Sequence, residues 1–198
     1  MSGTTAYDRS GNGYNGTINR ATPTNGKVGQ ALDFNGSNAS VASGAVFTDL
    51  GTSNHPYSFS VWVNVDEGES DGNIIHMVGG GWCLPPVQID AGYFKGYSWP
   101  GGTTVVDTDP AEKGVWSHIV VTWDSANGQR IFVNGVLKNT TAQATYSASG
   151  NNNTIYAGYS PGGCAGNQGF FDGKIDEVRI YNRSLTPDEA SRLYRLGR

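Results

Sequence analysis

Apolar and polar residues alternate with a period of two along most of the 198-residue chain, and this period predicts half-buried β-strands. The clearest run is 57–65, where one face carries Tyr57, Phe59, Val61, Val63 and Val65. A second run, 116–123, is apolar on both faces and therefore predicts a central strand. Weaker runs of the same kind predict further strands at 31–35, 73–78, 87–91, 103–106, 154–158 and 174–181.

Two segments carry strong local signals. Asn134-Gly135 separates the apolar runs 129–133 and 136–137 and predicts a hairpin, because both turn positions require positive φ. Thr186-Pro187-Asp188-Glu189 predicts the start of a short helix, with an N-cap threonine, a proline at the first helical position and a glutamate that completes a capping box. The apolar stripe of this helix consists of Ala190, Leu193 and Tyr194.

Many closely spaced strands joined by Gly and Asn turns, with one short C-terminal helix, predict an all-β fold: a two-sheet antiparallel sandwich. The length suits a single domain over residues 1–198. The 29 glycines and the 15% of charged residues exclude a helical bundle. No apolar run approaches the ~20 residues that cross a bilayer, so we expect no membrane insertion.

The charge distribution argues against nucleic acid as a partner. The net charge is −4, and the 13 Lys and Arg residues are scattered, so no basic stripe is available to neutralise phosphates. The first residues, Met1-Ser2-Gly3, show neither the charged nor the apolar region of a signal peptide. The polar residues that follow suggest a segment of a longer, multidomain chain.

The two cysteines, Cys83 and Cys164, each lie in a Gly/Pro-rich sequence, where a buried structural thiol is not expected. A disulfide between them would fit a secreted or cell-surface protein. A metal site would need more Cys or His nearby than the three scattered histidines provide. We therefore predict a Cys83–Cys164 disulfide that joins two loops.

A family resemblance rests on six segments, the last of which is Phe171-Asp172-Gly173-Lys174-Ile175-Asp176-Glu177-Val178-Arg179-Ile180-Tyr181; the others are 8–17, 26–37, 59–63, 116–124 and 133–135. In order and content they resemble the laminin G-like jelly-roll domains of the concanavalin A-like lectin/glucanase superfamily, over nearly the whole chain. The resemblance implies a jelly roll of two curved sheets. It leaves the function open, because this fold carries lectins, carbohydrate-binding modules, adhesion domains and glycosidases.

The resemblance also implies a structural calcium ion where an early strand meets the last one. In this chain that position corresponds to Asp33 and Asp176, with Asn35 and backbone carbonyls nearby as further oxygen ligands. Asp33 alternates with the apolar residues Leu32 and Phe34, so its carboxylate is expected to point away from the core. The alternative is that these are ordinary surface or turn carboxylates.

Aromatic residues outside the strand motifs are candidates for ligand binding. Three tryptophans fall within the motifs and are assigned to the core: Trp62, Trp116 and Trp123. Trp82 and Trp99 instead lie in Gly/Pro-rich sequences that predict loops, and Tyr97 and Tyr159 lie nearby in the chain. Sugar rings stack on such flat aromatic surfaces. The alternative is that both tryptophans cap one end of the sandwich.

The predicted disulfide would draw Trp82 toward Tyr159, because Cys83 adjoins the first and Cys164 follows the second by five residues. Trp99 would join them if 87–91 and 93–97 form a hairpin that returns the chain to the same end. These residues would then form one aromatic platform.

Catalytic groups are not apparent. Glycoside hydrolysis needs two carboxyls that flank one bond, ~5–5.5 Å apart or wider, and no predicted strand places two on one face. The densest acidic stretch, 66–72, contains glycines and predicts a loop, and the three histidines assemble no nucleophilic grouping. The sequence therefore predicts a non-catalytic module that binds a polysaccharide or glycan. A protein-interaction or adhesion domain is the alternative, followed by a glycoside hydrolase-like enzyme.

Overall fold

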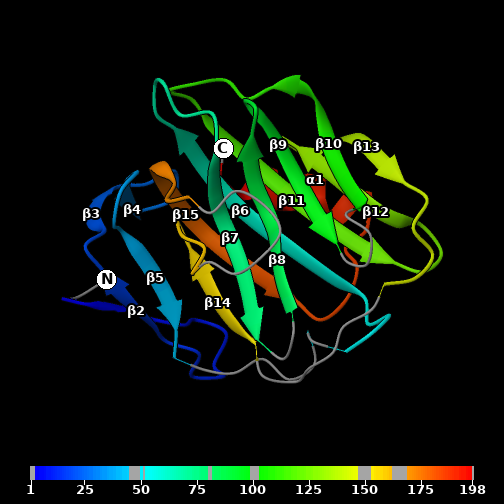
Figure 1. The fold of residues 1–198 in the computed structure, drawn as a ribbon, viewed down its shortest axis with the longest axis horizontal. Helices are drawn as coiled ribbons and strands as arrows, with labels where there is room; N and C mark the ends of the chain where they lie inside the picture. Colours follow the sequence, from blue (N-terminus) through cyan, green and yellow to red (C-terminus); the bar gives the residue numbers. More distant parts are fainter. Residues whose placement is uncertain are drawn as a thin grey trace.

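The computed structural model describes residues 3–44, 50, 52–79, 82–98, 103–146, 153–161 and 169–197, with the backbone alone for 82–85 and 103. The strands form two antiparallel sheets that pack face to face (Figure 1). The short helix lies behind them in this view. The expected all-β jelly-roll sandwich is confirmed.

One sheet has eight strands in the order β1-β2-β5-β14-β7-β8-β9-β10. Their bounds are β1 Thr5–Ala6, β2 Gly16–Asn19, β5 Ser40–Ser43, β14 Thr154–Ala157, β7 Gly72–Gly79, β8 Trp82–Asp90, β9 Tyr93–Ser98 and β10 Thr103–Pro110.

The other sheet has seven strands in the order β13-β12-β11-β6-β15-β4-β3. Their bounds are β13 Val136–Thr141, β12 Gly128–Val133, β11 Trp116–Asp124, β6 Tyr57–Val65, β15 Asp172–Tyr181, β4 Gln30–Asn35 and β3 Thr22–Asn25. The helix α1, Pro187–Leu196, follows β15.

The core between the sheets contains the five alternating residues of β6 that the pattern identified: Tyr57, Phe59, Val61, Val63 and Val65. The other face of β6 is buried as well, because α1 covers it. The Trp62 ring lies 5.6 Å from the Tyr194 ring of the helix and 5.0 Å from the His118 ring of β11. The seven-stranded sheet is therefore covered on both faces around its centre.

The two strong local signals are confirmed. Asn134 and Gly135 form the β12–β13 turn with φ values of 52° and 78°. At the start of α1, the Thr186 side chain accepts a hydrogen bond from Glu189 N, and the Glu189 carboxylate accepts one from Thr186 N at 2.9 Å. Each element begins where its turn or cap residues predict.

The expectation that Trp82 and Cys83 lie in a loop is wrong. They are the first two residues of β8 and pair with Gly79 and Val78 of β7. The ladder between β7 and β8 shifts register between Ile75 and Met77, opposite the Pro85-Pro86 pair. Prolines have no N–H to donate, so a central strand can contain them only where its ladder is interrupted.

Candidate functional site

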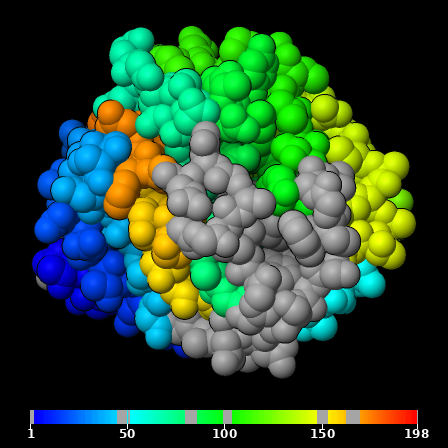
Figure 2. Space-filling model, viewed as in Figure 1, coloured from blue at the N-terminus to red at the C-terminus, as the bar shows by residue number. Residues whose placement is uncertain are grey.

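The outer face of the eight-stranded sheet, which looks toward the viewer in Figure 2, carries an unusual set of side chains. Ile155 of β14 and Met77 of β7 are cross-strand partners that pack in the core. The neighbouring pair, Tyr156 and His76, therefore lies on the opposite face of the sheet. This face is not covered by α1, which packs on the other sheet.

A row of uncharged polar side chains crosses this face from β14 toward β8. Asn73 of β7 pairs with Gln88 of β8, and both are buried. His76 Nε2 lies 3.4 Å from Ser160 Oγ, and Asn73 Nδ2 donates to Gly169 O at 3.1 Å. Burial lowers the pKa of His76 to about 4, so the imidazole is neutral near pH 7. The row therefore offers hydrogen-bonding groups without a net charge.

Aromatic rings adjoin this row. The rings of Tyr159 and Phe170 stack with centroids 4.4 Å apart and planes at 19°, and the Tyr156 ring meets Tyr159 edge-on at 6.0 Å. In Figure 2 the yellow and orange segments that contain these residues lie side by side. Together they form an aromatic cluster at the edge of the polar row.

Gly158 brings the two parts of this cluster together. Its φ of +75° turns the chain at the end of β14, and a Cβ here would lie 2.1 Å from Phe34 Cδ1 in the core. The Gly158 N–H donates to Ile74 O, and its carbonyl accepts from Phe171 N, each at 3.0 Å. Only glycine fits at this position. The turn at Gly158 places Tyr159 next to Phe170.

The aromatic residues singled out from the sequence are spread over the sheet. Tyr159 is in the cluster, and Tyr97 is half-buried on β9 against the core. Trp82 lies beside Gly79 of β7, and Gly158, which precedes Tyr159, lies beside Ile74 of the same strand. Gly79 and Ile74 are five residues apart, so Trp82 and Tyr159 are separated by about 17 Å along β7. Trp99 lies outside the described residues, so its part in a platform stays a prediction.

The β8–β9 hairpin on which the platform depended is confirmed. Asp90 pairs with Tyr93, and the turn between them has positive φ at Ala91 and Gly92. The start of β8 and the end of β9 therefore lie at the same end of the sheet. Cys164 lies outside the described residues, and the Cys83–Cys164 disulfide stays a prediction.

Three residues were singled out for calcium, and much of their oxygen capacity is already used. Asp33 is half-buried on β4, opposite Lys174 of β15. Asn35 Oδ1 accepts four hydrogen bonds within its own turn. Both Asp176 oxygens accept backbone N–H groups, those of Val28 and Glu177 at 2.8 Å each. Within the described ranges, no group of three or more His, Cys, Asp or Glu is placed to hold a metal ion.

Calcium at Asp33 and Asp176 stays a prediction, and it would draw on backbone carbonyls to approach the ~6–8 oxygens that calcium takes. We expect added calcium to raise the melting temperature of chelator-treated protein, because an ion that binds only the folded state stabilises it by mass action. Thermal melting with calcium, with magnesium as the control cation and with excess chelator measures this. Identical curves in all three conditions would exclude the site.

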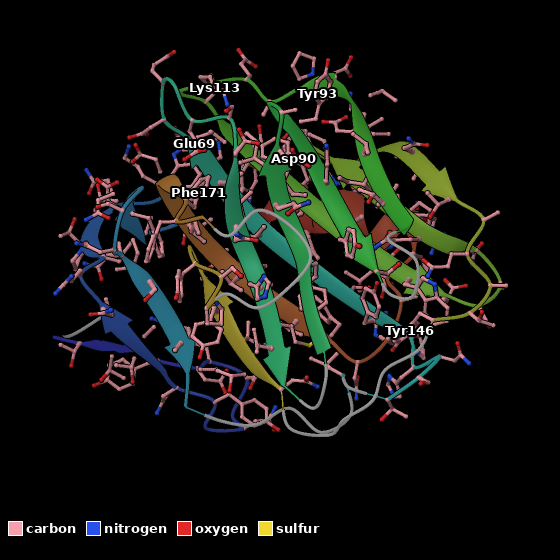
Figure 3. All side chains as sticks on the ribbon, in the orientation of Figure 1. Glu69, Asp90, Tyr93, Lys113, Tyr146 and Phe171 are labelled. Carbon is pink, nitrogen blue, oxygen red and sulfur yellow. The ribbon has the colours of Figure 1, made fainter. Side chains whose placement is uncertain are left out.

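The acidic loop 66–71 closes one end of the sandwich. The Glu69 carboxylate accepts the N–H of Asp71 at 2.6 Å and that of Asp172 at 3.0 Å, and Lys113 Nζ donates to Glu69 O. Figure 3 shows Glu69 and Lys113 at the same end of the sandwich as Tyr93, with Tyr146 at the other end. The Glu69 carboxylate thus holds this end of the fold together.

The comparison with family models identifies the family. A family model described as the concanavalin A-like lectin/glucanases superfamily, of laminin G type, matches residues 35–191. No curated protein sequence matches the chain significantly. No helix in the described part of the chain is long and apolar enough to cross a membrane.

Several solved structures share the fold. Domain 4 of AbnA, an extracellular GH43 arabinanase from Geobacillus stearothermophilus solved in complex with arabinotriose, has a TM-score of 0.65 at 22% identity, covering 93% of this chain and 91% of that one. The botulinum neurotoxin serotype G binding domain has a TM-score of 0.71 at 17% identity, with 96% of this chain and 48% of that one covered. The Trypanosoma rangeli sialidase in complex with sialic acid has a TM-score of 0.68 at 17% identity, with 98% of this chain and 31% of that one covered. The chain thus spans nearly all of the arabinanase domain but half or less of the other two.

Proposed function

Because this chain belongs to the laminin G-like family of the concanavalin A-like lectin/glucanase superfamily, we propose that it is a non-catalytic carbohydrate-binding module of a larger secreted or cell-surface protein. The observation that carries the proposal is the aromatic cluster of half-buried Tyr156, Tyr159 and Phe170 beside a buried, uncharged polar row on the outer face of the sheet. The other sheet has its corresponding face covered by α1.

This arrangement matches the chemistry of a neutral glycan. The C–H faces of a sugar ring pack on aromatic rings, while its hydroxyls exchange hydrogen bonds with amide, imidazole and hydroxyl groups. Gln88 Oε1 is a buried acceptor without a hydrogen-bond partner in the described ranges, and His76 is neutral near pH 7. Lys95 of β9, the cross-strand partner of Gln88, is ion-paired with Asp90 at 2.9 Å, so the charges beside the row already compensate one another. The proposed ligand is therefore an uncharged oligosaccharide or polysaccharide.

One of the solved structures supports this class of ligand. The arabinanase domain, which the chain covers almost completely, is described in complex with the neutral sugar arabinotriose. We propose that Trp82, Tyr97 and Trp99 extend the binding surface from the cluster toward the end of β9, so that a glycan chain lies along the face. A glycoside hydrolase-like activity has less support, because the row consists of uncharged side chains and the carboxylate beside it, Asp90, is ion-paired with Lys95 at 2.9 Å.

Binding should be weak, with a Kd on the order of 10 μM to 1 mM, since sugar hydroxyls exchange water hydrogen bonds for protein ones. A glycan array probed with and without calcium selects the ligand, and titration calorimetry with the best neutral hit measures its affinity. We expect Tyr159→Ala, Trp82→Ala and Trp99→Ala each to weaken binding at least tenfold. The matched control is Tyr93→Ala, an exposed tyrosine at the start of β9, which β7 and β8 separate from the β14 strand that precedes Tyr159.

Melting curves of the four variants separate binding from folding. The site is refuted if all three variants bind as tightly as the parent, or if Tyr93→Ala weakens binding as much as they do. A large drop in the melting temperature of Trp82→Ala and Trp99→Ala, with binding retained, would show instead that the tryptophans cap the sandwich.

A further inference from the structure

A large hollow opens between the two sheets, away from the polar row, where β1, β2 and β5 face β4 and β15. Its volume is about 1220 Å³, above the ~300–1,000 Å³ of a typical small-molecule pocket. Its floor is apolar and comes from both sheets, with Leu32, Phe34, Val41, Leu50, Ile155 and Ile175. The size and the apolar floor point to an elongated ligand with apolar groups.

Exposed apolar side chains gather at the same place. In the described part of the chain nine large hydrophobic residues are exposed, and four of them line this hollow. They are Tyr7, Tyr14, Val28 and Val178, with exposed fractions of 58%, 38%, 41% and 40%. Apolar residues that cluster on the surface mark interaction sites, whereas isolated ones do not.

One wall of the hollow is an edge of β15 with which none of the described strands pairs. β15 pairs with β6 up to its last residue, Tyr181, with a register shift between Asp176 and Arg179 and a positive φ of 50° at Glu177. It pairs with β4 only from Asp172 to Ile175. No strand in the described ranges pairs with the other edge of residues 177–181, and all five of these residues line the hollow. Such an edge presents backbone N–H and C=O groups that another strand can bind.

We propose that this edge and hollow bind an extended peptide strand of a partner protein, which adds to the seven-stranded sheet beside β15. Backbone hydrogen bonds to residues 177–181 would hold the strand, and alternate side chains would enter the hollow. The side chains that enter must be aliphatic to match the apolar floor. This binding mode uses both features of the site, the free edge and the hollow.

The charges at the rim favour a partner strand without net charge. Three acids line the hollow, Asp8, Asp176 and Glu177, with two bases, Arg9 and Arg179. Asp176 is buried and both of its carboxylate oxygens accept backbone N–H groups, so two acids and two bases remain at the rim. Hydrogen bonds from Ser10 lower the pKa of Asp8, which is therefore ionised, and Glu177 forms an ion pair with Arg179. A neutral strand leaves this balance undisturbed. A glycan fits less well, because its hydroxyls do not repeat with the ~6.6 Å spacing of bonding groups along a strand edge.

The test uses an eight-residue peptide, acetylated and amidated at its ends, with valine at alternate positions and threonine between them. We expect it to bind with a Kd on the order of 100 μM and to slow hydrogen exchange of amides within 177–181. Two further peptides are controls. One has the same composition with its four valines consecutive, and the other is N-methylated at its central four amides; both should bind at least tenfold more weakly.

A pair of variants tests the position. Val178→Lys should weaken binding at least tenfold. Val136→Lys should not change it, because Val136 is an exposed valine on β13, the far edge strand of the same sheet. Equal binding of the N-methylated peptide, or unchanged exchange within 177–181, would overturn the proposal even if Val178→Lys failed to fold. Protection of 177–181 by a neutral oligosaccharide, or by self-association of the protein without peptide, would overturn it as well.

This proposal is independent of carbohydrate binding. The peptide strand contacts the edge of the seven-stranded sheet, and the glycan contacts the outer face of the eight-stranded one. We expect Val178→Lys to lose peptide binding and keep glycan binding. We expect Tyr159→Ala to lose glycan binding and keep peptide binding.

Discussion

Replacement of Gly158 by alanine is expected to lower the free energy of unfolding by several kcal/mol. The new Cβ would lie 2.1 Å from Cδ1 and 2.4 Å from Cε1 of Phe34, a fully buried ring in the core. Overpacking a core costs about 1–3 kcal/mol or more, and the positive φ adds roughly 1–2 kcal/mol for a residue with a side chain. Denaturant unfolding measures the sum.

The matched control is Gly29→Ala. Gly29 has a similar φ of +68°, but a Cβ there would meet no atom within 4 Å. It should therefore show only the backbone cost. Equal losses of unfolding free energy in Gly158→Ala and Gly29→Ala would mean that the contact with Phe34 does not restrict the side chain at position 158.

Gly158→Ala should also disturb the Tyr159–Phe170 stack. We therefore expect the folded fraction of this variant to bind glycan more weakly than the parent.

Acid should destabilise the protein through two buried histidines. Burial lowers the pKa of His76 and of His118 to about 4 from the usual 6.5, and the Arg179 charge contributes at His118. The unfolded chain thus binds more protons than the folded one between these values. The stability that each neutral imidazole contributes is fully present above pH 6.5 and is lost as the pH falls toward 4, in total on the order of 3 kcal/mol per histidine.

The window from pH 6.5 to 5 isolates this effect. There the slope should approach about 1.4 kcal/mol per pH unit for each histidine. At lower pH, carboxyls contribute with both signs, since burial raises the pKa of Asp107, Asp172 and Asp176 whereas the pKa of Glu189 is held near 2 by Arg183. His118→Gln, measured by denaturant unfolding across the window, should lose about half of the slope. An unchanged slope would show that His118 does not titrate as the burial implies.

Elements with a complete local signal were predictable from the sequence. β6 and β11 have long apolar runs, the β12–β13 turn contains Asn134-Gly135, and α1 begins with a capping box. In each case the residues that determine the structure are neighbours in the chain. Nothing distant has to be known to place them.

Elements stabilised by distant partners were not predictable in this way. β1, β2, β3 and β5 have two to four residues each, mostly polar or small, and are strands only because of their ladders. The candidate site likewise depends on contacts between residues that are far apart in the sequence. Tyr156 meets His76 across 80 positions of sequence, and Phe170 meets Tyr159 only because Gly158 lets the chain pass over Phe34. The alternation of Tyr156 with Ile155 and Ala157 was the one local hint to the outer face.

The strand order has a consequence for how the chain folds. β15 lies between β6 and β4, and β14 lies between β5 and β7, so each sheet receives a central strand from the last quarter of the chain. Neither sheet can become continuous until nearly all residues have left the ribosome. Before that, four strands present unpaired edges, which is the condition that favours chaperone binding or aggregation. Since pairing must close loops of roughly 80 residues or more, folding is expected in the millisecond-to-second range of non-local β proteins.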